Sequence, residues 1–172
     1  MRLHQIIALV TGLAFVAYAL HAHAPLNPPS LSPAQSSAVE SAVRSFAQSV
    51  AHDVTHDGPL AWHKYLEDSP AFFMAVDGAM AFPDSAAAKV GVDAFAPTIQ
   101  HIELAWGDDL RVDPLTPNLA VVAATYHELQ IFTSGKRVDE HGFFTGTAEL
   151  RDGHWQFRNA HWSEPLSTAA GK

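Results

Sequence analysis

Histidine is the residue type in this chain best suited to acid–base chemistry. The sequence has 11 histidines and no cysteine. The lack of cysteine excludes disulfide scaffolds, thiolate zinc sites, iron–sulfur clusters and cysteine nucleophiles. A partly buried histidine beside an amide or a hydroxyl can act as a general base near neutral pH. His127, Asn159, His161 and Ser163 lie in the last predicted strands and are the candidates for such a group.

The other histidines do not predict a metal site. His52 and His56 are four residues apart on a predicted helix, a spacing at which two imidazoles can share a metal ion. They lie off the apolar stripe of that helix and alternate with Asp53 and Asp57, which is typical of a solvated face. The sequence has no His-Glu-x-x-His motif, no Gly-x-Ser-x-Gly motif and no glycine-rich phosphate loop. We therefore expect no metal and no cofactor.

The composition predicts one globular domain. The chain has 172 residues, of which 48% are hydrophobic and 16% are charged. This length allows one hydrophobic core but not two comfortable domains. The 18 acidic and 10 basic residues give a formal net charge of −8. We expect no nucleic-acid partner, because a protein that binds along phosphates needs a basic face.

The first 24 residues predict a secretory signal peptide. Arg2 and the α-amino group precede an apolar run over residues 6–20. Cleavage after residues 22–24 (Ala-His-Ala) fits the small-x-small rule, and residues 17–19 (Ala-Tyr-Ala) offer a second position. An uncleaved N-terminal anchor is the alternative, although the run is short for a membrane span. We expect a periplasmic or secreted protein that has no membrane segment after cleavage.

The rest of the chain divides into a linker (25–31), a folded domain (32–165) and a flexible tail (166–172). Ser32 and Gln35 have the spacing of a capping box and predict a helix that ends near His56. A short second helix is expected after it.

Turn and cap residues predict the remaining elements. Asp77-Gly78 is typical of a two-residue hairpin between strands at 72–76 and 79–82. Asp93 is predicted to cap a helix that runs through His101. Four strands are then expected at about 102–112, 119–132, 138–150 and 154–163.

Two turns predict how the last strands pair. A two-residue turn at Asp152-Gly153 places Phe144 opposite His161. A two-residue turn at Ser134-Gly135 places Thr125 beside Phe144, whereas a three-residue loop would invert the faces of that strand.

This register gives the two sheet faces different roles. The inner face becomes polar toward one end and is expected to form a pocket, with no carboxylate in its middle and Glu140 only at its mouth. The candidate ligand-binding residues are Asn159, His161, His127, Ser163, Thr125, Phe144 and Trp62, and His161 and His127 are the candidate general bases. The outer face carries a predicted homodimer interface made of Tyr126, Phe143, Trp162, Glu128 and His141. His141 would lie there between Glu128 and Glu164, which suggests a pH-sensitive interface.

The order of elements resembles a known family. Helices, a hairpin, a capped helix and a curved meander that ends in Asp152-Gly153, Trp155, His161 and Ser163 resemble the SnoaL-like branch of the nuclear transport factor 2-like superfamily. The resemblance covers about residues 33–164. It implies an α+β fold, a cone-shaped barrel in which a curved, mainly antiparallel sheet wraps over N-terminal helices. It also implies an apolar pocket and a homodimer formed through the sheet.

The resemblance does not select one function, because this fold carries isomerases, dehydratases, cyclases, hydrolases and members with no known activity. Three hypotheses follow. The domain binds a small apolar or amphipathic molecule, or it is an isomerase, cyclase or hydrolase that uses a pocket histidine as general base, or it is a dimerising interaction module with no ligand.

Overall fold

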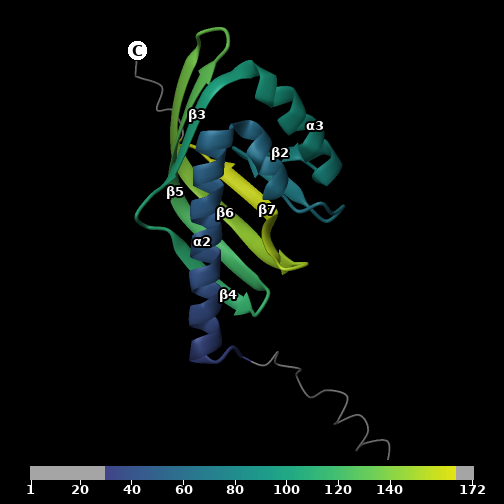
Figure 1. Ribbon diagram of the computed structural model, residues 1–172, viewed down its shortest axis with the longest axis vertical. Helices are drawn as coiled ribbons and strands as arrows, with labels where there is room; N and C mark the ends of the chain where they lie inside the picture. The colour runs from purple at the N-terminus through teal and green to yellow at the C-terminus, as the bar shows by residue number, and fades with distance from the viewer. Residues whose placement is uncertain (1–29, 166–172) are drawn as a thin grey trace, which may run out of the picture. The chain divides into compact units, whose positions relative to one another are not determined.

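The computed structural model describes residues 30–165 (Figure 1). The predicted signal peptide, most of the predicted linker and the predicted tail lie outside these residues. No helix within residues 30–165 is long and apolar enough to cross a membrane.

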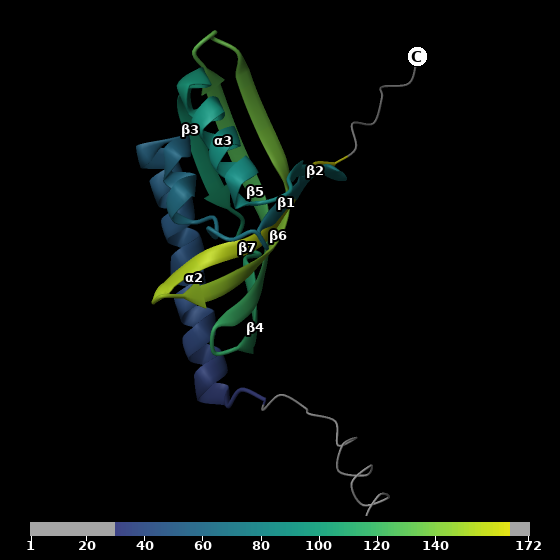
Figure 2. The same cartoon turned by 90° about the vertical axis from the view of Figure 1, so that its right-hand side faces the viewer.

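Helix α2 (Pro33–Asp57) forms as predicted. The Ser32 side chain accepts a hydrogen bond from the backbone of Gln35, and the Gln35 side chain accepts one from the backbone of Ser32, so the capping box is present. The buried face of the helix includes Val39, Val43, Phe46, Val50 and Val54. Figure 2 shows α2 along one side of the curved sheet, where this face packs against β3 (Ile99–Trp106), β4 (Arg111–Thr116) and β5 (Leu119–Phe132).

The short elements after α2 form one wall of the fold. They are the 3₁₀ helix η1 (Pro59–Lys64), strands β1 (Phe73–Val76) and β2 (Ala79–Phe82), helix α3 (Ser85–Phe95) and the 3₁₀ helix η2 (Ala96–Thr98). The predicted hairpin is present, and Asp77 and Gly78 both have the positive φ that its two-residue turn requires.

The prediction that Asp93 caps a helix was wrong. Asp93 lies inside α3, and Asp84 caps that helix by accepting a hydrogen bond from the backbone of Ala87 at 2.8 Å. The alanine-rich segment after Asp84 favours a helix. Helical backbone then continues only through η2, and strand β3 begins at Ile99, so Asp93 has no room to start a helix of its own.

The sheet confirms the predicted α+β class. Strands β6 (Arg137–Arg151) and β7 (His154–Ser163) complete it, and the strand order is β2-β1-β7-β6-β5-β3. Strand β3 pairs with the C-terminal half of β5, and β4 pairs with its N-terminal half. Among these strand pairs, only β1–β7 is parallel. The sheet curves around the helices without closing into a complete barrel (Figure 2).

The predicted register between β5 and β6 was wrong by one residue. The loop between the strands is Thr133-Ser134-Gly135, because the Phe132 backbone N–H donates to the Lys136 carbonyl at 2.8 Å. Phe144 therefore lies opposite Ala124 instead of Thr125. Since side chains alternate along a strand, the shift turns every predicted inner residue of β5 outward.

A β-bulge changes the register of β7 as well. Ala148 lies opposite Phe157 as predicted, but Thr147 lies opposite Asn159, which leaves Arg158 as the extra residue. Beyond the bulge, His161 pairs with Thr145, and Trp162 takes the place predicted for His161 opposite Phe144.

Candidate functional site

A cavity of about 250 Å³ lies between the inner face of the sheet and the wall formed by η1, α3, β1 and β2. Most of its lining is apolar and includes Trp62, Met74, Phe82, Val92, Phe95 and Trp162. One end is polar and is lined by Tyr126, Glu128, Gln130, Glu140 and Glu164. These five residues are the acidic end of the cavity.

Strand alternation explains why these polar residues gather. Tyr126, Glu128 and Gln130 are every second residue of β5, so they share its inner face. Glu140 lies directly opposite Glu128 on β6. Glu164 follows β7 and is joined through its backbone N–H to the Asp77 carboxylate at 2.8 Å, next to the turn of the β1–β2 hairpin. Strands β5 and β6 and the residue that follows β7 thus contribute carboxyl groups to one end of an apolar cavity.

Burial and two neighbouring carboxyl groups disfavour the charged form of Glu140. Burial raises the pKa of Glu140 to about 7, with further contributions from the negative charges of Glu164 and Glu128 and from a hydrogen bond with Glu164. Burial also raises the pKa of Glu128, although the Gln130 amide donates a hydrogen bond to its carboxylate. At neutral pH, Glu140 can therefore either release or accept a proton.

Tyr126 is held at the boundary between the aromatic and acidic parts of the cavity. Its ring lies edge-on against Trp162, with centroids 4.7 Å apart and an interplanar angle of 86°. The ring passes over Gly142, where a Cβ atom would lie 2.6 Å from it. Burial, followed by the nearby carboxylates, raises the pKa of the Tyr126 hydroxyl. The hydroxyl therefore stays protonated at neutral pH and can donate a hydrogen bond.

The expectation that no carboxylate lies within the inner face was wrong. It depended on the predicted β5–β6 register, which was itself wrong by one residue. The earlier inner positions of β5, Ala120, Val122 and Ala124, are all buried, and the alternation continues without a break to Tyr126 and Glu128. The signal was present in the sequence. It was ambiguous because the intervening outer positions, Val121 and Ala123, are apolar too.

Most of the predicted ligand-binding residues lie on the outer face. Those placed outside are His127, His161, Asn159, Ser163 and Thr125, while Phe144 and Trp62 lie on the inner side as predicted. Four of these outer residues, Thr125, His127, Asn159 and Ser163, bond to neighbouring backbone or side chains. For example, the Ser163 hydroxyl donates to the Phe143 carbonyl at 3.1 Å, and the Thr125 hydroxyl donates to the Asp109 carboxylate at 2.7 Å. The proposed pocket role of the histidines therefore loses its geometric basis.

The predicted dimer interface is divided between the two faces. Tyr126, Trp162 and Glu128 line the cavity, so they do not form an aromatic and charged row on the outer surface. Phe143 and His141 remain outside. The acidic neighbour of His141 is Asp139, at 3.5 Å, instead of the predicted Glu128 and Glu164. The homodimer stays a prediction, without the aromatic row on which it was based.

Comparison with known proteins identifies the fold. A scan against protein-family models and a search of curated proteins gave no match. Among solved structures, the chain is similar to an NTF2-like superfamily protein from Salmonella enterica serovar Typhimurium, with a TM-score of 0.65 and 14% identity over 79% of this chain and 97% of that one.

Two further structures carry the names of enzymes. One is a Novosphingobium aromaticivorans protein provisionally assigned as a scytalone dehydratase, with a TM-score of 0.59 and 14% identity over 72% of this chain and 82% of that one. The other is a type 2 hexachlorocyclohexane dehydrochlorinase (LinA), with a TM-score of 0.53 and 14% identity over 70% of this chain and 84% of that one. At these identities the comparisons establish the fold alone, and the predicted fold is confirmed: this chain has the NTF2-like fold.

Proposed function

We propose that the cavity binds a small, mainly apolar molecule and exchanges a proton with it through Glu140. The observation that carries the proposal is the meeting of Glu128, Glu140, Glu164 and Tyr126 at one end of an apolar cavity. Carboxyl groups gathered in such a place cost stability, because burial and mutual repulsion oppose their ionisation. Groups of this kind are concentrated at active sites, where a shifted pKa serves proton transfer.

The arrangement supports removal of a proton from carbon. In its ionised form, Glu140 would take a proton from a carbon atom next to a carbonyl group, and the C–H electron pair would form the C=C bond of an enolate. The negative charge would then develop on the carbonyl oxygen, to which the Tyr126 hydroxyl would donate a hydrogen bond. The apolar wall would hold the rest of the substrate and exclude water.

The names of the similar structures support this class of reaction. A dehydratase removes water from its substrate and a dehydrochlorinase removes hydrogen chloride. Each elimination requires a group that accepts a proton from carbon. The acidic end would disfavour anionic substrates, so we propose neutral ones.

A pair of compounds with the same ring frame tests the binding part of the proposal. We expect 2-naphthol, which is neutral, to bind at least tenfold more tightly than 2-naphthoate, because the carboxylate would face the acidic end. Isothermal titration at pH 7 gives both affinities. Equal affinities, or binding of neither compound, would contradict the proposed cavity.

Two variants with the same new side chain locate the binding. Val76 lines the cavity, whereas Val121 lies on the outer face of β5. We expect Val76→Trp to weaken 2-naphthol binding at least tenfold, because the indole would fill the cavity, and Val121→Trp to leave it within twofold. Equal losses in both variants would place the ligand elsewhere, and no loss in either would leave the cavity without a role.

We further propose that the protein acts in the periplasm or outside the cell. The support is the sequence of the N-terminus, where Arg2 precedes an apolar run and an Ala-His-Ala site. Mass spectrometry of the protein from its own cells tests this, with an expected N-terminus at Leu20 or Pro25. A chain that keeps Met1 in the cytosolic fraction would contradict the proposal.

A further inference from the structure

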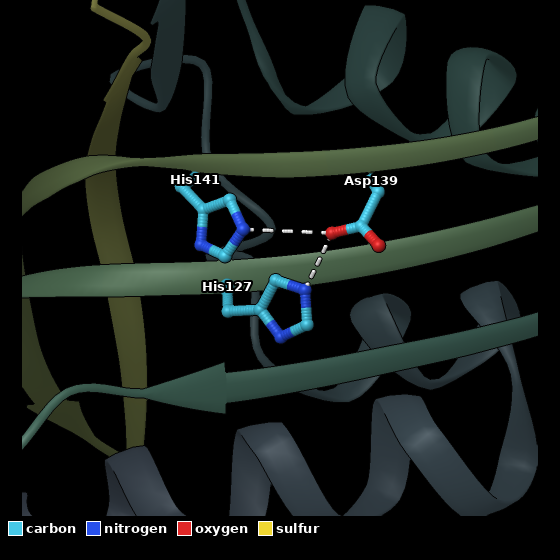
Figure 3. Close-up of side chains that lie close together, drawn as sticks. All are labelled: His127, Asp139 and His141. Atoms are coloured by element: carbon cyan, nitrogen blue, oxygen red, sulfur yellow. Dashed lines mark hydrogen bonds and ion pairs between the residues drawn. The ribbon is translucent and has the colours of Figure 1, made fainter.

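His127, Asp139 and His141 form a cluster on the outer face of the sheet, on the side opposite the cavity (Figure 3). His127 on β5 lies directly opposite His141 on β6. Their rings are stacked, with centroids 4.4 Å apart and an interplanar angle of 13°. Asp139 precedes His141 by two residues, so its side chain points to the same face.

Both imidazoles approach the same carboxylate oxygen. The distance to Asp139 Oδ1 is 2.7 Å from His127 Nε2 and 3.5 Å from His141 Nε2. The second oxygen, Oδ2, is held by Arg137 at 3.1 Å. Arg137 thus fixes the carboxylate with Oδ1 directed at the two rings, as Figure 3 shows for the three side chains.

The three side chains lie close enough together to share one metal ion. One ligand atom from each residue lies within 4.8 Å of the other two. A tetrahedral zinc ion with bonds of about 2.0–2.1 Å needs ligand atoms about 3.3 Å apart. Rotation of the exposed side chains, which would turn the stacked rings toward a shared ion, would bring the three atoms to that spacing. Two imidazoles and one carboxylate are a donor set that suits zinc and its neighbours better than magnesium or calcium.

Solvent can reach the cluster. The side chains of His127 and Asp139 are 42% and 43% exposed, and that of His141 is 71% exposed. A shallow hollow beside the rings is lined by both histidines together with Gly107, Thr125 and Gly142. A bound ion would therefore keep at least one coordination position for water.

We propose that His127, Asp139 and His141 bind a divalent transition-metal ion such as Zn²⁺. The ion would join β5 to β6 directly behind Glu128 and Glu140, the next opposed pair of residues along the same two strands. The site is distinct from the proposed substrate cavity because the two occupy opposite faces of the sheet. The first effect of the bound ion would be to cross-link β5 to β6 and so stabilise the fold.

Titration of the full-length, chelator-treated protein with Zn²⁺ tests the proposal. His4, His21 and His23 precede the described residues and could bind zinc themselves, so the comparison between variants is decisive. We expect one zinc-binding event to weaken at least tenfold in His127→Ala and in His141→Ala. Because both side chains are exposed, these variants should keep their fold, which circular dichroism checks.

The paired histidines of α2 provide a matched control. His52 and His56 are also stacked, with centroids 4.1 Å apart, but Nδ1 of His56 is directed at the His52 carbonyl. His56→Ala should therefore bind zinc like the wild type. Zinc should also raise the Tm of the wild type and of His56→Ala, but not that of His141→Ala.

Cobalt provides a readout that does not depend on affinity. Co²⁺ bound by the wild type should give visible ligand-field bands that are lost in His127→Ala and kept in His56→Ala. Three results would overturn the proposal: no zinc binding by the wild type at millimolar concentration, equal binding by wild type and His141→Ala, or loss of binding only in His56→Ala.

Discussion

Glu140→Gln is expected to make the protein more stable at pH 8 and to lose this advantage at pH 5. The folded pKa of Glu140 is about 7, above the ordinary value of 4.5, so the folded state holds this proton more tightly than the unfolded state. The contribution of protonated Glu140 to the stability of the wild type is therefore complete below about pH 4.5 and is lost as the pH rises through 7. Glutamine does not ionise in this pH range, so Glu140→Gln does not lose this stability as the pH rises.

The size of the effect is limited by solvent at the open side of the cavity. After allowance for this screening, we expect a gain of about 1 kcal/mol at pH 8, equal to roughly 3 °C in Tm. Thermal unfolding of chelator-treated protein at pH 5, 6, 7 and 8 measures it. Treatment is needed because a cation behind Glu140 would lower its pKa.

An exposed glutamate gives the control for this experiment. Glu103 lies on β3 and pairs with His101 at 2.7 Å, away from the cavity. Glu103→Gln should show no gain in stability between pH 5 and 8. If Glu140→Gln were destabilising at pH 8, or if its effect were the same at all four pH values, the described environment of Glu140 would be wrong.

Arg151→Met is expected to cost about 3 kcal/mol of stability, because it leaves a buried charge without its partner. The Glu67 side chain is only 2% exposed, and its Oε1 lies 2.7 Å from Arg151 Nη2. Neither Glu67 oxygen accepts a well-aligned hydrogen bond within residues 30–165. Glu67 also ties the segment after η1 to β7, since its backbone N–H donates to the Phe157 carbonyl at 2.9 Å.

Urea unfolding at pH 7 compares this variant with a surface ion pair. Arg158 pairs with Glu149 at 3.0 Å, and Arg158→Met should cost less than about 1 kcal/mol. The double variant Glu67→Met/Arg151→Met should recover most of the loss, because it removes both charges. Equal costs for the two arginine variants, or no recovery in the double variant, would contradict this account of Glu67.

Local sequence signals predicted most of the elements, although the single strand expected at about 102–112 is two strands, β3 and β4. The capping box of Ser32 and Gln35, the Asp77-Gly78 hairpin and the Asp152-Gly153 turn each depend on a few adjacent residues, and each is present. The NTF2-like fold was predicted from a resemblance carried by the order of these elements and by the closing pattern of Asp152-Gly153, Trp155, His161 and Ser163. The cap of α3 was misplaced because two aspartates, Asp84 and Asp93, precede segments with helical character.

The site could not be predicted at the same level, because it depends on register. One extra loop residue at Thr133–Gly135 and one bulge at Arg158 decide which side chains face the cavity. Neither feature has a strong local signature, yet each exchanges the two faces of a strand. His127 and His161 consequently lie outside, and Glu128, Glu164 and Tyr126 lie inside.

Proton exchange into a bound ketone tests the central claim most directly. A suitable compound is 1-tetralone, whose fused rings match those of 2-naphthol, and deuterium entry at its α-carbon in D₂O can be followed by NMR at neutral pH. All proteins are treated with chelator, because a cation behind Glu140 would lower its pKa. We then expect the wild type to accelerate exchange, Glu140→Gln to lose about 100-fold or more of that acceleration, and His127→Ala to stay within twofold of the wild type. If 1-tetralone displaces 2-naphthol and the wild type gives no acceleration, or if His127→Ala removes it while Glu140→Gln keeps it, the assignment of Glu140 is contradicted.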